Sequence, residues 1–235
     1  MRTEFKLHAS SADKIFGVKG LGKTGETYLN DWMKERVFGR KKEFDSKYFE
    51  KGNFCEQDAL DFSAKILGFE HSYKNDEYFE DEHFCGTPDL ILEKDGLIVD
   101  IKNSWDCFTF PLFEEEIPNQ GYYLQLQIYM HLTGYRKAKL VYCLMDAPND
   151  LINKEAKRQA WASGLMGFAN EDILGHVKQR MIYSNMPDKL RIKSFDISYD
   201  EKVIDKLKGR VNECKQYVKS NIIFKSFINQ QSCQK

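Results

Sequence analysis

The stretch Gly86–Lys102 constrains the fold of this chain more than any other segment. It holds two short apolar runs, Leu90–Leu92 and Leu97–Ile101, on either side of Asp95-Gly96. Asp-Gly between β-forming residues is a strong hairpin signal, because both central residues of a type I′ turn need positive φ. The sequence therefore predicts an antiparallel hairpin with a two-residue loop.

Pairing outward from this loop brings three charged side chains together. In the predicted register Leu92 faces Val99, and Asp89 faces Lys102. Because side chains alternate along a strand and paired residues share a face, Asp89, Asp100 and Lys102 point the same way. The apolar run is nearly continuous, as in a strand that is covered on both faces. The three charges therefore indicate a site; the alternative is that they are surface charges on the wet face of a half-buried hairpin.

The composition is that of a folded globular protein. The chain has 235 residues, 42% hydrophobic and 14% aromatic, which is enough for a substantial core. No apolar run approaches the ~18 residues that span a bilayer, and the N-terminus lacks the apolar core of a signal peptide, so we expect a cytoplasmic protein.

The six cysteines contain no Cys-x-x-Cys pair, which argues against structural zinc and a disulfide framework. A formal net charge of −1 argues against a pure nucleic-acid coat protein but allows a local basic surface.

Helical patterns flank the hairpin on both sides. Apolar residues at helical spacing predict helices over residues 24–37, 48–67 and 119–134. The second helix places Glu56 on its buried face or at the edge of the apolar stripe, where it is either a half-exposed residue or a buried carboxylate that needs a partner. The third helix places Gln125 and Tyr129 on one face, one turn apart.

The remaining segments are assigned by the same patterns. A short strand or arm in residues 1–20 leads into a helix that is capped near Ser10 or Ser11. Residues 71–85 alternate charges with aromatics and predict one or two strands entering the central sheet. Further elements are a strand at 139–145, helices at 149–163 and 171–183, a strand at 189–198 and a helix at 199–220.

Four motifs along the chain resemble those of one enzyme superfamily. Pro88-Asp89, ten intervening residues and then Asp100-Ile101-Lys102 resemble the signature of the PD-(D/E)xK nucleases. Lys51–Glu56 followed by Ala59 is similar to the Gly-x-x-x-Glu helix motif of phage λ-type exonucleases, and Gly86 stands where that family has a glycine before Pro-Asp. Gln125 and Tyr129 match the Gln-x-x-x-Tyr motif of the RecB-like and λ-exonuclease-like (YqaJ-type) branch.

The resemblance implies a fold and an activity. The expected fold is α/β (α+β), with a restriction-endonuclease-like core in αβββαβ order and a central mixed sheet flanked by helices. Residues 1–235 would form a single nuclease domain, with the core motifs in 45–145 and an elaboration in 149–235. The expected enzyme is a metal-dependent DNA exonuclease that acts 5′→3′ on linear duplex ends in phage-type recombination.

The residue types suit phosphodiester hydrolysis, which needs a hard cation to neutralise phosphate charge and activate water. Hard cations prefer oxygen ligands, and Asp89, Asp100, Glu56 and the backbone carbonyl of Ile101 are the expected donors. We expect Mg²⁺, with Mn²⁺ as a substitute, and no iron–sulfur cluster, because the tight cysteine set of the cluster-bearing relatives is absent. Lys102 would orient or deprotonate the attacking water or stabilise the transition state.

Several residues are candidates for contacts with DNA. Gln125 and Tyr129 would hold the DNA end or the catalytic residues in register, Ser104 would donate to a phosphate, and Ser10 would contact the 5′-phosphate. Trp105, Phe108 and Phe110, in the segment after the hairpin, are either core residues or platforms for unpaired bases.

The resemblance also implies partners and a location. The partners would be linear duplex DNA, a single-strand annealing protein and further copies of the chain in a trimer, with no membrane, in a bacterial or phage-infected cell. The alternatives are a Cas4-like or RecB-like nuclease on single strands without an iron–sulfur cluster, or a catalytically inactive DNA-binding module on the same fold. A site-specific endonuclease fits Gln125 and Tyr129 less well.

Overall fold

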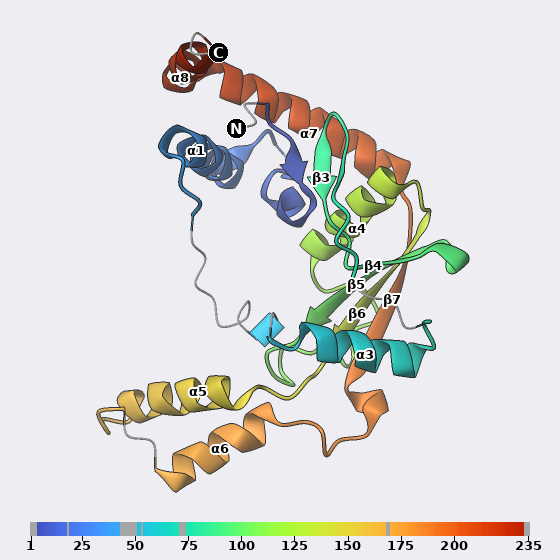
Figure 1. Ribbon diagram of the computed structural model, residues 1–235, viewed down its shortest axis with the longest axis vertical. Coiled ribbons are helices and arrows are strands. Elements are labelled where there is room, and N and C mark those ends of the chain that lie inside the picture. The colour runs from blue at the N-terminus through green and yellow to red at the C-terminus, as the bar shows by residue number, and fades with distance from the viewer. Residues whose placement is uncertain are drawn as a thin grey trace.

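A computed structural model describes residues 4–17, 19–42, 51–52, 54–70, 74–167 and 170–232 (Figure 1). Within these residues, the larger sheet has the order β4-β5-β6-β7. Its strands are β4 (Leu90–Leu92), β5 (Leu97–Asn103), β6 (Lys137–Cys143) and β7 (Ile192–Ser198). The central pair β5–β6 is parallel, and β4 and β7 add antiparallel edges. The sheet is mixed, as expected.

The hairpin differs from the prediction in its loop and its register. Leu90 pairs with Val99, and Leu92 pairs with Leu97 rather than with Val99. The loop has a 3-10 turn, Glu93–Asp95, followed by Gly96 at φ 60°, and Asp95 does not take the positive φ that a type I′ turn requires. The register is therefore shifted by two residues, and because side chains alternate with period two, every side chain keeps its predicted face.

Helices cover both faces of this sheet (Figure 1). On one face α3 (Glu56–Leu67) packs over a cluster that contains Leu90 and Val99. On the other face α4 (Gln120–Thr133) packs over the main core, which contains Ile98. The prediction of a strand covered on both faces is confirmed for β5.

Capping residues mark both ends of α4. The Asn119 side chain accepts a hydrogen bond from the Gly121 amide and caps the first turn, and Gly134 ends the helix at φ 82°. Parallel strands need a crossover, and α4 supplies it between β5 and β6.

A second sheet lies beside the first, in the order β1-β3-β2. Its strands are β1 (Leu7–His8), β2 (Phe79–Glu80) and β3 (Phe84–Gly86). The prediction that residues 71–85 enter the central sheet is wrong for β2 and β3, because β3 pairs in parallel with the N-terminal β1. The alternation of aromatic and charged residues indicates a strand but does not specify its partner. Residues 71–73 lie outside the described residues.

The remaining helices extend the molecule in two directions (Figure 1). At one end lie α1 (Gly22–Phe38), the 3-10 turn η1 (Ala9–Lys14), α7 (Glu201–Ser220) and α8 (Ile222–Ser232). At the other end α5 (Asn149–Ala162) pairs with α6 (Glu171–Met181), and the 3-10 turn η3 (Asp188–Leu190) precedes β7. None of the described helices has the length and hydropathy of a membrane span.

Two boundaries differ from those predicted. The helix expected over 48–67 is continuous only from Glu56, which is the first residue of α3; residues 51–52 are helical, while 43–50 and 53 lie outside the described residues. The helix expected after Ser10 is a 3-10 turn.

Candidate active site

Asp100 lies at the centre of the predicted site, on β5 and fully buried. Its Oδ1 accepts a hydrogen bond from Gln125 Nε2 at 3.2 Å. Its Oδ2 lies 2.7 Å from Lys102 Nζ, and apart from this ion pair it has no hydrogen-bond donor in the described part of the chain. A buried carboxylate oxygen without a hydrogen bond is costly unless a charge or a ligand compensates it.

Asp89 lies beside Asp100, directly before β4. Its Oδ2 accepts a hydrogen bond from the backbone amide of Ile101 at 3.0 Å. Burial, and next the negative charge of Asp100, raise the pKa of Asp89 to about 6. Two carboxylates thus share one poorly solvated region, and a cation bound between them would relieve their repulsion.

Lys102 supplies the positive charge of this group. Burial alone would lower the pKa of Lys102, but the carboxylates of Asp100 and Asp89 outweigh it and raise that pKa above its ordinary value. The Nζ atom also lies 4.8 Å from the centre of the Tyr122 ring, within range of a cation–π contact. Lys102 is therefore an ammonium at neutral pH, which suits electrostatic stabilisation better than proton abstraction.

Gln125 and Tyr129 share one face of α4, as predicted, and are buried behind Asp100. Gln125 Nε2 donates to Asp100 Oδ1 and also to the Tyr129 hydroxyl, at 3.0 Å. Burial, and next the charge of Asp100, raise the pKa of Tyr129. Gly86 makes room for this ring, because a Cβ there would lie 2.7 Å from Tyr129 Cε1. The structure thus places the pair against Asp100 rather than on the pocket surface.

Most of the predicted residues meet at one pocket, which has a volume of about 730 Å³. The site residues that line it are Glu56, Asp89, Ile101, Lys102 and Ser104. The Ser104 side chain is directed to the Thr109 carbonyl, with 3.4 Å between Oγ and O. Ser10 does not line this pocket; it is exposed on η1, and its hydroxyl lies 2.9 Å from Nδ1 of His8.

Glu56 reaches the pocket from the first turn of α3, but its carboxylate is half-exposed. Its Oε1 forms a 2.7 Å ion pair with Lys74 Nζ, which raises the pKa of that lysine. The half-exposed reading of Glu56 is the one that the structure supports. In the described residues, no group of three or more His, Cys, Asp or Glu side chains is arranged to hold a metal ion, so Glu56 would have to leave Lys74 to join Asp89 and Asp100.

Comparison with solved structures tests the resemblance over the whole chain. A phage-related exonuclease from Haemophilus somnus 129PT matches with a TM-score of 0.77 and 26% identity, over 97% of both chains. The chain has the fold of the λ-exonuclease-like PD-(D/E)xK nucleases. An alkaline exonuclease from Laribacter hongkongensis, LHK-Exo, shares this fold with a TM-score of 0.65 and 14% identity, over 98% of this chain and 95% of that one, and so does its complex with dAMP. The sequence matches no protein-family model and no curated protein.

The donor atoms of this nuclease fold suit a hard divalent cation. The expected donors are the Asp89 carboxylate, Oδ2 of Asp100 and the carbonyl of Ile101, and all are oxygens; within the described residues Oδ2 has the Lys102 ion pair and no hydrogen-bond donor. Mg²⁺ prefers such ligands, whereas softer metals prefer sulfur or imidazole. The residues present therefore fit the metal that the PD-(D/E)xK resemblance implies.

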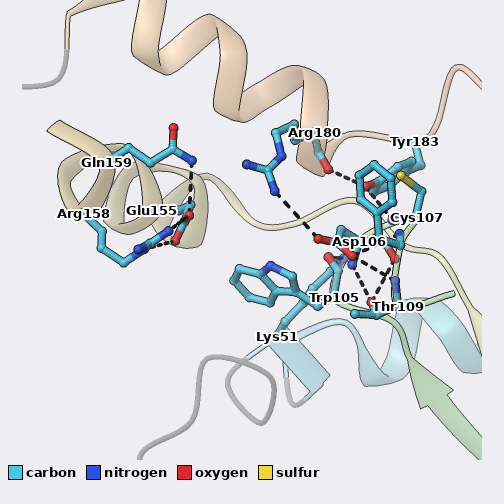
Figure 2. A network of polar contacts seen from close by, with 11 residues as sticks. Lys51, Trp105, Asp106, Cys107, Thr109, Glu155, Arg158, Gln159, Arg180 and Tyr183 are labelled. Carbon is cyan, nitrogen blue, oxygen red and sulfur yellow. Dashed lines mark hydrogen bonds and ion pairs between the residues drawn. The ribbon is translucent and has the colours of Figure 1, made fainter. Parts of the chain in front are cut away.

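One buried residue of the site region was not predicted. Lys51 is fully buried, and its Nζ donates to the carbonyls of Ser104 and Trp105 at 2.9 Å each (Figure 2). Burial lowers the pKa of Lys51 to about 8. The Lys51 side chain thus ties the segment before α3 to the loop after β5. Periodicity alone gives no signal for such a contact, because its partners lie more than fifty residues away.

Proposed function

We propose that the protein is a metal-dependent DNA exonuclease that hydrolyses phosphodiester bonds from linear duplex ends in the 5′→3′ direction, in phage-type recombination. The observation that carries this proposal is the group of Asp89, Asp100 and Lys102 at one pocket, in a chain that matches a phage-related exonuclease over 97% of its length.

The metal would be Mg²⁺, with Mn²⁺ as a substitute, held by Asp89, Asp100 and the Ile101 carbonyl, with Glu56 as a further ligand. When bound, it would neutralise phosphate charge and lower the pKa of the attacking water. Among the described residues Lys102 is the one group that Oδ2 of Asp100 contacts as a partner, so this oxygen would be available to a metal ion.

The chain's own side chains would position and stabilise the reacting phosphate. Lys102, kept charged by two carboxylates, would stabilise negative charge that develops on the phosphate oxygens. Gln125 would hold Asp100 in one orientation from the buried side. Ser104 lines the same pocket and would donate to a phosphate after it releases the Thr109 carbonyl.

The partners follow from this activity. We propose linear duplex DNA as substrate, a single-strand annealing protein as the recombination partner, and assembly of identical chains, with residues 1–235 acting as one nuclease domain in the cytoplasm. Ser10 remains our candidate for the 5′-phosphate contact, although it lies outside the lining of the pocket.

Incubation of linear, nicked and closed circular duplex DNA with the protein and Mg²⁺ tests the activity. We expect degradation of linear DNA that EDTA abolishes and Mn²⁺ restores, with a 5′-end label released before a 3′-end label. Cutting of closed circles would contradict an exonuclease.

The variant Lys102→Ala should abolish cleavage and leave DNA binding largely intact. Lys94→Ala is the matched control, because Lys94 lies in the same hairpin, is exposed and pairs with Glu70 on the surface. Equal activity of Lys102→Ala and the wild type would remove Lys102 from the mechanism.

A further inference from the structure

The loop after β5, residues 104–109, presents an exposed phenylalanine beside the pocket. Trp105, near the start of this loop, and Phe110, just after it, are 7% and 5% exposed, whereas Phe108 is 86% exposed. A single exposed apolar side chain needs no explanation by itself. The position of Phe108 does need an explanation, because Trp105 and Thr109 of the same loop line the pocket.

A tight turn holds the backbone on both sides of Phe108. The Thr109 amide donates to the Asp106 carbonyl at 3.2 Å. Asp106 Oδ1 accepts from the amides of Phe108 and Thr109 at 3.1 and 3.0 Å, and the Tyr183 hydroxyl accepts from the Cys107 amide at 3.0 Å (Figure 2). The ring of Phe108 is therefore presented by a fixed turn and has little backbone entropy to lose when it meets a ligand.

The base of the turn is fixed from two further directions. Lys51 holds the carbonyls of Ser104 and Trp105, and Arg180 of α6 approaches Asp106 at 4.0 Å (Figure 2). The turn that carries Phe108 is therefore anchored both to α6 and to Lys51, which precedes α3.

We propose that Phe108 stacks on a nucleobase of the strand whose phosphate occupies the pocket. This inference rests on the proposed function and deepens it. Every base has a π-face, so stacking on an aromatic side chain tolerates any sequence, as a nuclease that digests whole strands requires. A base inside a duplex is stacked on both faces, so Phe108 fits a terminal or unpaired base. The substrate class that it fits is thus a DNA end, where a terminal or unpaired base has a free face.

A thermodynamic cycle between Phe108 and one base tests this contact without cleavage. DNA affinity is measured by fluorescence anisotropy for Lys102→Ala protein with and without Phe108→Ala, on duplexes with an unpaired end and with single abasic sites along the terminal nucleotides. At one position, removal of the base should weaken binding about 5- to 150-fold, the equivalent of about 1–3 kcal/mol of base–aromatic stacking. In Phe108→Ala protein the same abasic site should cause no further loss.

Two further variants separate stacking from simple apolar contact. Phe108→Trp should retain the affinity, whereas Phe108→Leu should lose it, because leucine has no π-face. Phe38→Ala is the control and should bind as before, since Phe38 is 70% exposed at the end of α1 and no residue of α1 lines the pocket, whereas the neighbours of Phe108 in its loop do.

The stacking contact would be overturned if the losses of affinity from Phe108→Ala and from base removal were additive at every abasic position. Full affinity of Phe108→Leu for DNA would overturn it too. A protein that digests linear DNA but shows this additivity overturns this inference alone. A protein that neither digests nor binds linear DNA with Mg²⁺ overturns the proposed function, and the inference with it.

Discussion

Gln125 fixes Asp100 from the buried side of β5, so we expect it to act on the rate rather than on DNA affinity. Gln125→Leu removes the donor to Asp100 Oδ1 and should lower the single-turnover rate and the Mg²⁺ affinity about 10- to 100-fold, the usual cost of losing a residue that orients a metal ligand. Single-turnover cleavage over a range of Mg²⁺ concentrations measures both.

Tyr129→Phe is the control for Gln125→Leu. It removes one hydroxyl contact of Gln125 but keeps the bond to Asp100, so its effect should be smaller. A larger loss in Tyr129→Phe than in Gln125→Leu would mean that the tyrosine, not the glutamine, positions Asp100.

The buried Lys51 predicts a pH dependence of stability. Burial lowers its folded pKa from 10.5 to about 8, and the nearby Cys55, Asp106 and Asp146 oppose this shift only in part. Between these two values the unfolded chain binds more protons than the folded one, so the free energy of unfolding rises with pH. Relative to Lys51→Met, which cannot titrate, the wild type should gain about 3 kcal/mol from pH 8 to 10.5.

Urea unfolding of both proteins at several pH values measures this gain. The neutral amine of Lys51 still has two N–H donors for its two carbonyl partners, so the contacts survive deprotonation. Lys65→Met, at an exposed position of α3, should run parallel to the wild type. If the unfolding free energy of Lys51→Met changed with pH in the same way as that of the wild type, the pKa of Lys51 would not be lowered in the folded state.

At the level of elements, the approach of β3 to α4 depends on Gly86. Gly86→Ala places a Cβ 2.7 Å from the Tyr129 ring and 3.2 Å from the Ala9 Cβ. Overpacking of this kind should cost about 1–3 kcal/mol of unfolding free energy and disturb the residues behind Asp100. Gly175→Ala in α6 meets open space and should stabilise by about 0.5–1 kcal/mol. Thermal unfolding distinguishes the two, and equal melting temperatures would contradict the close contact.

Helices and strands with a clear local sequence pattern could be predicted from the sequence. The elements that they pair with or pack against could not. The apolar spacing over residues 119–134 predicts a helix there, and in the structure Asn119 caps it and Gly134 ends it. The faces of the hairpin followed from a period of two, but its register depended on a 3-10 turn at Glu93–Asp95 that Asp-Gly does not specify. The pairing of β3 with β1 is set by tertiary packing.

The candidate site divides in the same way. The proximity of Asp89, Asp100 and Lys102 follows from strand geometry within one hairpin, and so it could be predicted. Lys51 could not, because its partners lie on a loop more than fifty residues later, and a buried lysine has no periodic signature. The ion pair of Glu56 with Lys74 is likewise a long-range contact.

At the scale of the whole molecule, α8 near the C-terminus packs against α1 near the N-terminus. Phe224 of α8 is buried, and its ring centre lies 5.7 Å from that of Trp32 in α1. Phe224→Ala should therefore cost about 3–5 kcal/mol of unfolding free energy, measured by denaturant titration. Ile222→Ala, at an exposed position of the same helix, should stay within about 0.5 kcal/mol of the wild type.

Activity provides a second test of Phe224→Ala. Residues of α8 do not line the pocket, so the cleavage rate below the melting temperature should be unchanged. A lower rate in fully folded Phe224→Ala protein would show that the α1–α8 end takes part in catalysis.

The crossover through α4 ties local opening to the site. Because α4 both connects β5 to β6 and carries Gln125, we predict that a fluctuation that lifts this helix from the sheet releases Asp100 and separates the parallel strands in the same event. The amides of Gln125 and Leu140 should then exchange with solvent hydrogen at the same opening free energy, as one cooperative unit. A sheet that is intact around a disassembled site is therefore a state that this topology hardly populates.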